Sequence, residues 1–289
     1  MVPLELYIRY KMLQVPLDEN RTLGPLSLNL YLNPREDSST SGVIEEGKLI
    51  VQEINQQLRS KFREVTGLPA PPNSEPMLVP ADKLSGWYPA LRNRPIRIAG
   101  NNLAFTARGS PEEIELALAA AASVGHLEKL GSAGPEERVT QLFNRYIGLD
   151  CAGFAGNFFV ACGYSWGGGP QKDTPPHSYA SHGREIGLDE AIPPGAVLLF
   201  PRFAEPFSSR ELSCEHIAVV SIGGPPKGML LVVESCSARN LAIGAYRRTG
   251  EGGVAKTRWT RGEPEEHIVH ELIHPSNHKV YVVIRALLG

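Results

Sequence analysis

Cys151 is the residue of this sequence best placed to act as a nucleophile. It stands where a loop that ends at Asp150 becomes a predicted helix over residues 151–162. Cysteine reacts as the thiolate, and the unpaired N–H groups and dipole at a helix N-terminus favour that form. Nucleophilic catalysis also needs a general base and a group that orients the base.

His216 and Glu234 are the candidates for these two roles. His216 opens a predicted strand that continues over residues 217–222, and Glu234 follows the next apolar run, 229–233. The connection over residues 223–228 is short enough for the two strands to be neighbours, which would turn both side chains toward one site. The alternative is a structural one. Cysteine is most often a small buried hydrophobic residue, and a histidine at a strand start is usually a satisfied or surface residue.

Three blocks of the chain resemble the NlpC-type cell-wall peptidases, a family of papain-like cysteine peptidases. Residues 150–154 read Asp-Cys-Ala-Gly-Phe and are similar to the family's Asp-Cys-Ser-Gly-Phe signature. Residues 192–200 are similar to its Pro-Gly-Asp strand, and residues 216–220 to its His-Val-Gly-Ile-Tyr strand. The blocks occur in the family's order over roughly residues 135–289, and Glu234 falls where the family carries a third polar residue. The family more often has His, Asn or Gln there.

The resemblance implies a cysteine peptidase or amidase that acts on short peptides derived from peptidoglycan. In it Cys151 is the nucleophile that forms a thioester, His216 the general base and Glu234 the group that orients His216. Asp150 would bind a free substrate amine. Further substrate contacts are expected at Tyr146, Ala152 and Ser235, although Ala152 lacks the hydroxyl of the usual serine. No metal or cofactor is implied.

Two other functions use the same residues. One is a non-catalytic module on the same fold that binds a peptide or protein. The other is an acyltransferase that passes the thioester acyl group to an acceptor other than water.

A zinc site is the competing interpretation of a second motif. Residues 270–274 read His-Glu-Leu-Ile-His, which matches the H-E-x-x-H pattern of zinc peptidases. That pattern binds zinc only on a helix, where both histidines share one face. Pro275 disfavours a helical conformation at His274. We therefore expect a loop or strand here and no zinc.

The elements that must position these residues predict an α+β protein. Strands are expected over residues 4–10 and 26–32, and a hairpin over 96–99 and 103–107. Helices are expected over residues 45–65, 111–124, 135–147 and 151–162, and the second of these has Ser110 as N-cap. Strands over 196–200, 217–222, 229–233 and 280–284 would form an antiparallel sheet against the helix that carries Cys151, which is the papain-like arrangement that the resemblance implies.

A proline-rich run divides the predicted domains. Residues 67–80 contain five prolines in 14 residues, and proline is unsuited to a helix interior or a central strand. We therefore predict an accessory α+β region over 1–66, a linker over 67–80 and a papain-like domain over 81–289, with its core at about 135–289.

Composition argues against several classes of partner. The 289 residues carry 29 Lys and Arg against 31 Asp and Glu, a formal charge of −2. A chain without excess cations is not expected to bind nucleic acid. No apolar run is long enough to span a bilayer, and the first residues do not read as a secretory signal. A cytoplasmic location is therefore expected, with export by a signal-independent route as the alternative. The sequence specifies no oligomeric state.

Overall fold

The computed structural model describes residues 1–33, 40–131, 133–164, 174–203, 216–236, 239–258 and 265–287. The chain forms two compact units, one over Ile8–Asp150 and the other over Met1–Tyr7 with Cys151–Gly289. Helices and antiparallel strands occur together, as predicted for an α+β protein.

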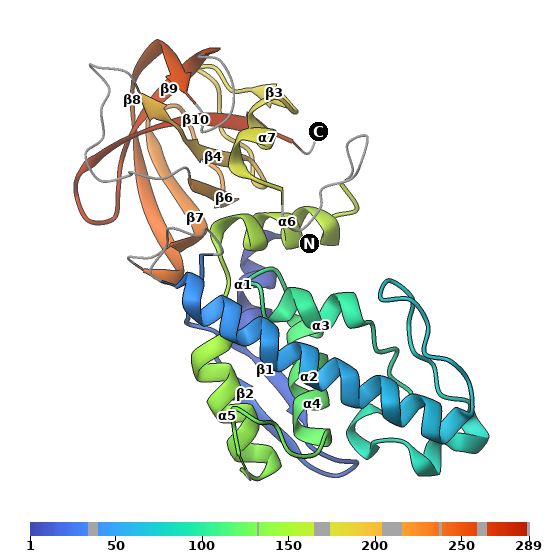
Figure 1. Cartoon of the computed structure of the whole chain (residues 1–289). Helices are drawn as coiled ribbons and strands as arrows, with labels where there is room; N and C mark the ends of the chain where they lie inside the picture. Colours follow the sequence, from blue (N-terminus) through green and yellow to red (C-terminus); the bar gives the residue numbers. More distant parts are fainter. Residues whose placement is uncertain are drawn as a thin grey trace. The chain divides into compact units, whose positions relative to one another are not determined.

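The unit Ile8–Asp150 is mainly helical. Its α-helices are α2 (Ser41–Thr66), α3 (Ile98–Ala104), α4 (Pro111–Ser123) and α5 (Pro135–Tyr146). Two 3-10 helices, η1 (Ala81–Gly86) and η2 (Pro89–Leu91), and the antiparallel pair β1 (Leu13–Pro16) and β2 (Thr22–Leu26) complete its regular structure among the described residues. Helix α4 lies against α3, α5 and β1 (Figure 1).

The three long helices of this unit confirm the sequence prediction. Helix α2 buries Ile50, Ile54 and Leu58, which recur at four-residue spacing along one face. Helix α4 begins with the predicted N-cap: the Ser110 side chain accepts from the Glu113 N–H, and the Glu113 carboxylate accepts from the Ser110 N–H. These reciprocal bonds satisfy two N–H groups that a helix start otherwise leaves unpaired.

Four predicted strands are wrong. Residues 4–10 belong to helix α1 (Pro3–Lys11), because Leu6 and Tyr10 are four residues apart and both buried, while Ile8 between them is exposed. Residues 27–33 have no regular structure. The expected hairpin over 96–107 is replaced by α3. There the buried Asn101 side chain donates to Asn55 at 2.9 Å, so packing against α2 outweighs the local turn signal.

The proline-rich run is part of a compact unit. Met77 is buried, and its N–H donates to the Ile96 carbonyl at 2.8 Å. The Asn73 carbonyl accepts from the Ala99 N–H at 3.0 Å. Residues 67–80 therefore pack within Ile8–Asp150, and the boundary between the two units lies at residue 151 rather than at residues 66–81.

The second unit contains an eight-stranded antiparallel sheet. Strand order is β3-β10-β4-β6-β7-β8-β5, and β9 pairs with both β10 and β8. The path β10-β4-β6-β7-β8-β9 therefore returns to β10 and closes a ring, which leaves these strands without a free edge. The strands are β3 (Arg184–Glu185), β4 (Val197–Phe200), β5 (Arg202–Phe203), β6 (His216–Ile222), β7 (Gly228–Cys236), β8 (Asn240–Arg258), β9 (Glu265–Ile273) and β10 (Lys279–Ala286).

Alternate residues of the ring form one buried cluster. It includes Phe200, Ala218, Val220 and Val232. Helix α6 (Cys151–Ala161) packs against β6 and β7, and the short helix α7 (Pro176–Ala180) against β4 and β10 (Figure 1). The predicted strands β4, β6, β7 and β10 are present.

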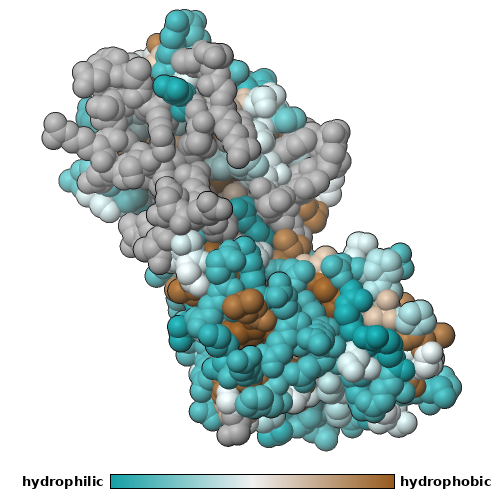
Figure 2. Space-filling model, viewed as in Figure 1, coloured by the Kyte–Doolittle hydropathy of each residue, from teal (hydrophilic) through white to brown (hydrophobic). Residues whose placement is uncertain are grey.

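The surface of the unit Ile8–Asp150 is largely hydrophilic on the face that Figure 2 shows, with small apolar patches. Exposed apolar side chains of this unit include Met12, Leu49 and Leu78. Within the part of the chain that the structure describes, no helix combines the length and the apolar character needed to cross a membrane.

Candidate active site

Cys151 is the first residue of α6 and is largely buried, with 8% of its surface exposed. The N–H groups of a first helical turn lack intrahelical acceptors, so the sulfur stands at the positive end of the helix. The helix packs closely on β6 and β7 because one side consists of small buried residues: Ala152, Gly153, Ala155 and Gly156.

His216 and Glu234 come together across two neighbouring strands. Strands β6 and β7 are antiparallel, with Val219 opposite Val233 and Val220 opposite Val232. This register places His216 at the start of β6 beside the end of β7, and the alternation of the strands turns it to the same face as Glu234. The His216 Nε2 atom lies 3.3 Å from Glu234 Oε2, and both side chains are buried.

The imidazole of His216 interacts with both Cys151 and Glu234. Burial by itself lowers the pKa of His216, but its hydrogen bonds and charge interactions with Cys151 and Glu234 raise this pKa well above the ordinary value. The ring therefore favours the imidazolium form. The ring of Phe200, opposite His216 on β4, packs on the imidazole with 5.1 Å between centroids.

Two further donors hold the Glu234 carboxylate. Arg239 Nη1 donates to Oε1 at 2.8 Å, and the Tyr246 hydroxyl donates to Oε2 at 3.0 Å. Burial raises the pKa of Glu234, but His216, Tyr246 and Arg239 outweigh burial and lower it below the usual value. Burial and the Glu234 charge raise the pKa of Tyr246, so the phenol stays protonated and acts as a donor.

Arg239 and Tyr246 were not predicted from the sequence to belong to this cluster. Tyr246 lies on β8, a strand that was not predicted because residues 240–258 hold several glycines and few apolar residues. The residues that alternate as buried along β8 are Gly244, Tyr246 and Arg248, which do not form an apolar pattern that the sequence could have revealed.

Asp150 and Tyr146 belong to the unit Ile8–Asp150. The Asp150 carboxylate lies 2.8 Å from Arg108 Nη2 in a largely buried ion pair. Asp150, the carboxylate that was predicted to bind a substrate amine, is thus already paired with a guanidinium. Tyr146 is buried at the end of α5, where burial and a hydrogen bond to Glu46 raise the pKa of its phenol.

Ala152 and Ser235 are both buried, and Ser235 has no exposed surface. Ala152 follows Cys151 in α6, and Ser235 lies next to Glu234 on β7. Of the other cysteines, Cys162 Sγ lies 3.5 Å from the Met1 carbonyl oxygen. Cys236 ends β7, and Cys214 falls outside the described residues.

The H-E-x-x-H segment lies on a strand, as predicted. His270 and Glu271 are in β9, and His274 follows the strand end. His270 Nε2 lies 2.9 Å from the Ile186 carbonyl oxygen, and Nδ1 lies 3.1 Å from Arg248 Nη2. Both ring nitrogens are therefore used inside the protein. The described residues include no group of three or more His, Cys, Asp or Glu that could hold a metal ion.

His270 makes the stability of the protein sensitive to acid. Burial lowers its pKa to about 4, the Ile186 carbonyl opposes this shift, and the Arg248 charge adds to it. Between pH 6.5 and about 4 the unfolded chain binds a proton that the folded protein does not. The free energy of unfolding therefore decreases as the pH is lowered through this range, by about 3 kcal/mol from this group.

We expect His270→Gln to lose less stability than the wild type between pH 7 and 4, measured by urea unfolding. His182→Gln is the control, and equal losses in His270→Gln and wild type would contradict the prediction.

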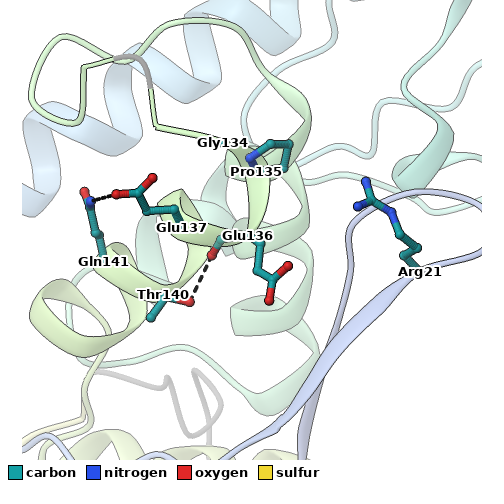
Figure 3. Close-up of a pocket in the computed structure, with 7 residues that line it drawn as sticks. All are labelled: Arg21, Gly134, Pro135, Glu136, Glu137, Thr140 and Gln141. Carbon is teal, nitrogen blue, oxygen red and sulfur yellow. Dashed lines mark hydrogen bonds between the residues drawn. The ribbon is translucent and has the colours of Figure 1, made fainter.

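A separate cavity occurs in the unit Ile8–Asp150. It has a volume of about 690 Å³ and is lined by Arg21 and the first two turns of α5 (Figure 3). Glu136 and Glu137 contribute carboxylates, and Thr140 and Gln141 bond back to the same helix. None of the predicted site residues lines this cavity.

Comparison with known protein families, with curated proteins and with solved structures gave no match to this chain. The candidate site therefore stands on its own geometry and on the resemblance of its short sequence motifs.

Proposed function

We propose that this protein is a papain-like cysteine peptidase or amidase that hydrolyses short peptides derived from peptidoglycan. The observation that carries the proposal is the contact series from Cys151 to His216 to Glu234. It joins a cysteine at a helix N-terminus to an imidazole, and the imidazole to a carboxylate. These are the three roles that nucleophilic cysteine catalysis requires.

In the acylation step the Cys151 thiolate attacks the carbonyl carbon of the scissile amide. The carbonyl oxygen gains the negative charge, and the N–H groups of the first turn of α6 are suitable donors to it. The carbon–nitrogen bond then breaks. The imidazolium of His216 gives its proton to the leaving amine, which leaves a thioester on Cys151 and a neutral imidazole.

In the deacylation step the neutral His216 takes a proton from a water molecule. The resulting hydroxide attacks the thioester carbonyl, the carbon–sulfur bond breaks, and the carboxylic product leaves. Cys151 returns to the thiolate and His216 to the imidazolium. Glu234 keeps its charge throughout and stabilises the imidazolium between the two steps.

The substrate class rests on the sequence resemblance. In that interpretation Asp150 binds the free amine of a wall peptide. Because Asp150 is paired with Arg108, a substrate amine would have to share or replace the guanidinium.

A panel of defined wall peptides tests the function. The protein is incubated with each peptide, and new amines are measured by mass spectrometry. Acid quenching during turnover is expected to trap one acyl group on the peptide that contains Cys151. Binding without cleavage of any peptide would contradict hydrolysis and favour the non-catalytic module. Acyl transfer to an added amine in preference to water would favour the acyltransferase.

A further inference from the structure

The Glu234 carboxylate is held at both of its oxygens. Oε1 accepts from Arg239 Nη1, while Oε2 accepts from the Tyr246 hydroxyl and also faces His216 Nε2. A glutamate side chain has three rotatable bonds, so burial alone does not specify the plane of its carboxylate. Hydrogen-bond donors on both oxygens do specify the plane of the carboxylate.

We propose that Arg239 and Tyr246 are positioning residues that hold the Glu234 carboxylate in the one orientation in which Oε2 meets His216. This inference rests on the proposed function, because the orientation of His216 matters only if the ring serves Cys151. Neither residue touches Cys151 in any contact described above, so both act through Glu234.

Gly244 makes this arrangement sterically possible. In the pairing of β7 with β8, Glu234 is opposite Ala242, whereas Tyr246 is opposite Leu230. The tyrosine ring must therefore run back along β8 to reach the carboxylate, and it passes Gly244. A Cβ atom at Gly244 would lie 2.7 Å from Arg239 Nη1 and 3.0 Å from Tyr246 Cε2. Because Gly244 has no side chain, the Arg239 guanidinium and the Tyr246 ring can occupy this space.

Arg239 also ties the carboxylate to the backbone. Its Nη1 donates to Glu234, while its Nη2 donates to the Ile243 carbonyl at 2.8 Å. The planar guanidinium fixes the angle between these two bonds, which a lysine ammonium would not do. Tyr246 is a neutral donor, so it directs Oε2 without adding a charge that would repel the imidazolium. Arg239 thus fixes Oε1 of Glu234 relative to the backbone, and Tyr246 directs Oε2.

Alkylation of Cys151 by iodoacetamide at pH 6 tests the proposal without requiring a known substrate. The rate is measured by mass spectrometry of the peptide that carries Cys151. We expect Tyr246→Phe and Arg239→Gln each to slow alkylation about tenfold, the effect of losing one hydrogen bond to a buried charge. Gly244→Ala, which displaces both donors, is expected to slow it at least as much. Arg239→Lys is expected to recover only part of the loss.

The decisive comparison repeats these variants in a Glu234→Gln background. Residues that act through the Glu234 carboxylate are expected to change the rate there by less than about twofold, because the group they position has lost its charge. A general structural role would slow alkylation equally in both backgrounds. Equal effects in the two backgrounds, or wild-type rates in the single variants, would overturn the proposal.

The same sheet supplies a matched control. The Glu271 carboxylate accepts from the Tyr281 hydroxyl at 3.2 Å and from Lys279 Nζ at 2.9 Å, so it has the same kind of partners. Tyr281→Phe is expected to leave the alkylation rate unchanged. If wild-type Cys151 reacts no faster than free cysteine, the proposed function itself fails. If it reacts fast and the variants do not differ from wild type, only the positioning role fails.

Discussion

Replacing Cys151 by alanine is expected to lower kcat/KM for peptide hydrolysis by about 10⁴-fold or more. The reason is that no thioester can form without the sulfur. The neighbours of Cys151 in α6 are small. Removing one sulfur atom at this nearly buried position is expected to leave the helix intact. Hydrolysis is measured as release of new amine from the best peptide of the panel, and folding by the thermal unfolding temperature.

Two variants make this test specific. Cys151→Ser keeps the volume but not the nucleophile, because a serine hydroxyl beside the same imidazole is far less acidic than a thiol; it is expected to be nearly as inactive. Cys162→Ala removes the thiol just after the other end of α6 and is expected to retain wild-type activity. Activity in Cys151→Ala above a tenth of the wild-type value would exclude the thioester mechanism.

Replacing His216 by alanine is expected to have the second largest effect. Because the pKa of His216 is raised well above its ordinary value, we expect the wild-type ring to be charged at pH 6, and a charged imidazole favours the thiolate form of a cysteine next to it. Without the ring we expect Cys151 to behave as an ordinary cysteine, of which only about 0.3% is thiolate at pH 6. Alkylation by iodoacetamide at pH 6 is therefore expected to fall about 100-fold, and hydrolysis about 10³-fold.

The pH dependence tests whether the lost alkylation rate comes from a lower thiolate fraction. At pH 9 an ordinary cysteine is mostly thiolate, so His216→Ala is expected to alkylate at close to the wild-type rate there. Because an unfolded chain would also carry an ordinary cysteine, folding is checked separately by the thermal unfolding temperature, which is expected to stay close to that of wild type. His182→Ala is the control and is expected to match wild type. Equal alkylation rates of His216→Ala and wild type at pH 6 would show that the imidazole does not activate the thiol.

The elements around the candidate site were largely predictable. Four apolar runs became β4, β6, β7 and β10, because strongly apolar runs bounded by turn residues have few alternatives to a buried strand. The helix over 151–161 was predictable for a related reason, since Asp150 and Gly163 bracket a run of small and aromatic residues. His216 and Glu234 then followed from the short connection between β6 and β7.

The errors occurred where a local pattern fits two structures. Residues 4–10 alternate apolar and polar as a strand does, but Leu6 and Tyr10 also share a helical face. Residues 100–102 read as a turn, yet Asn101 is a helical residue bonded to Asn55 from a distant part of the chain. In both cases burial against other elements decided between two local conformations of similar free energy.

The sequence by itself determined which residues could carry the chemistry: a cysteine at a helix start, and a histidine and a carboxylate at the ends of neighbouring strands. Those features are local and depend only on residue type and spacing. Only the tertiary structure decided the closed ring of strands, the boundary at residue 151 and the donors on Glu234. Arg239 and Tyr246 reach Glu234 because β8 pairs with β7 in one register and Gly244 leaves room between them. Strand pairing of this kind depends on contacts between chain segments, which no single segment specifies.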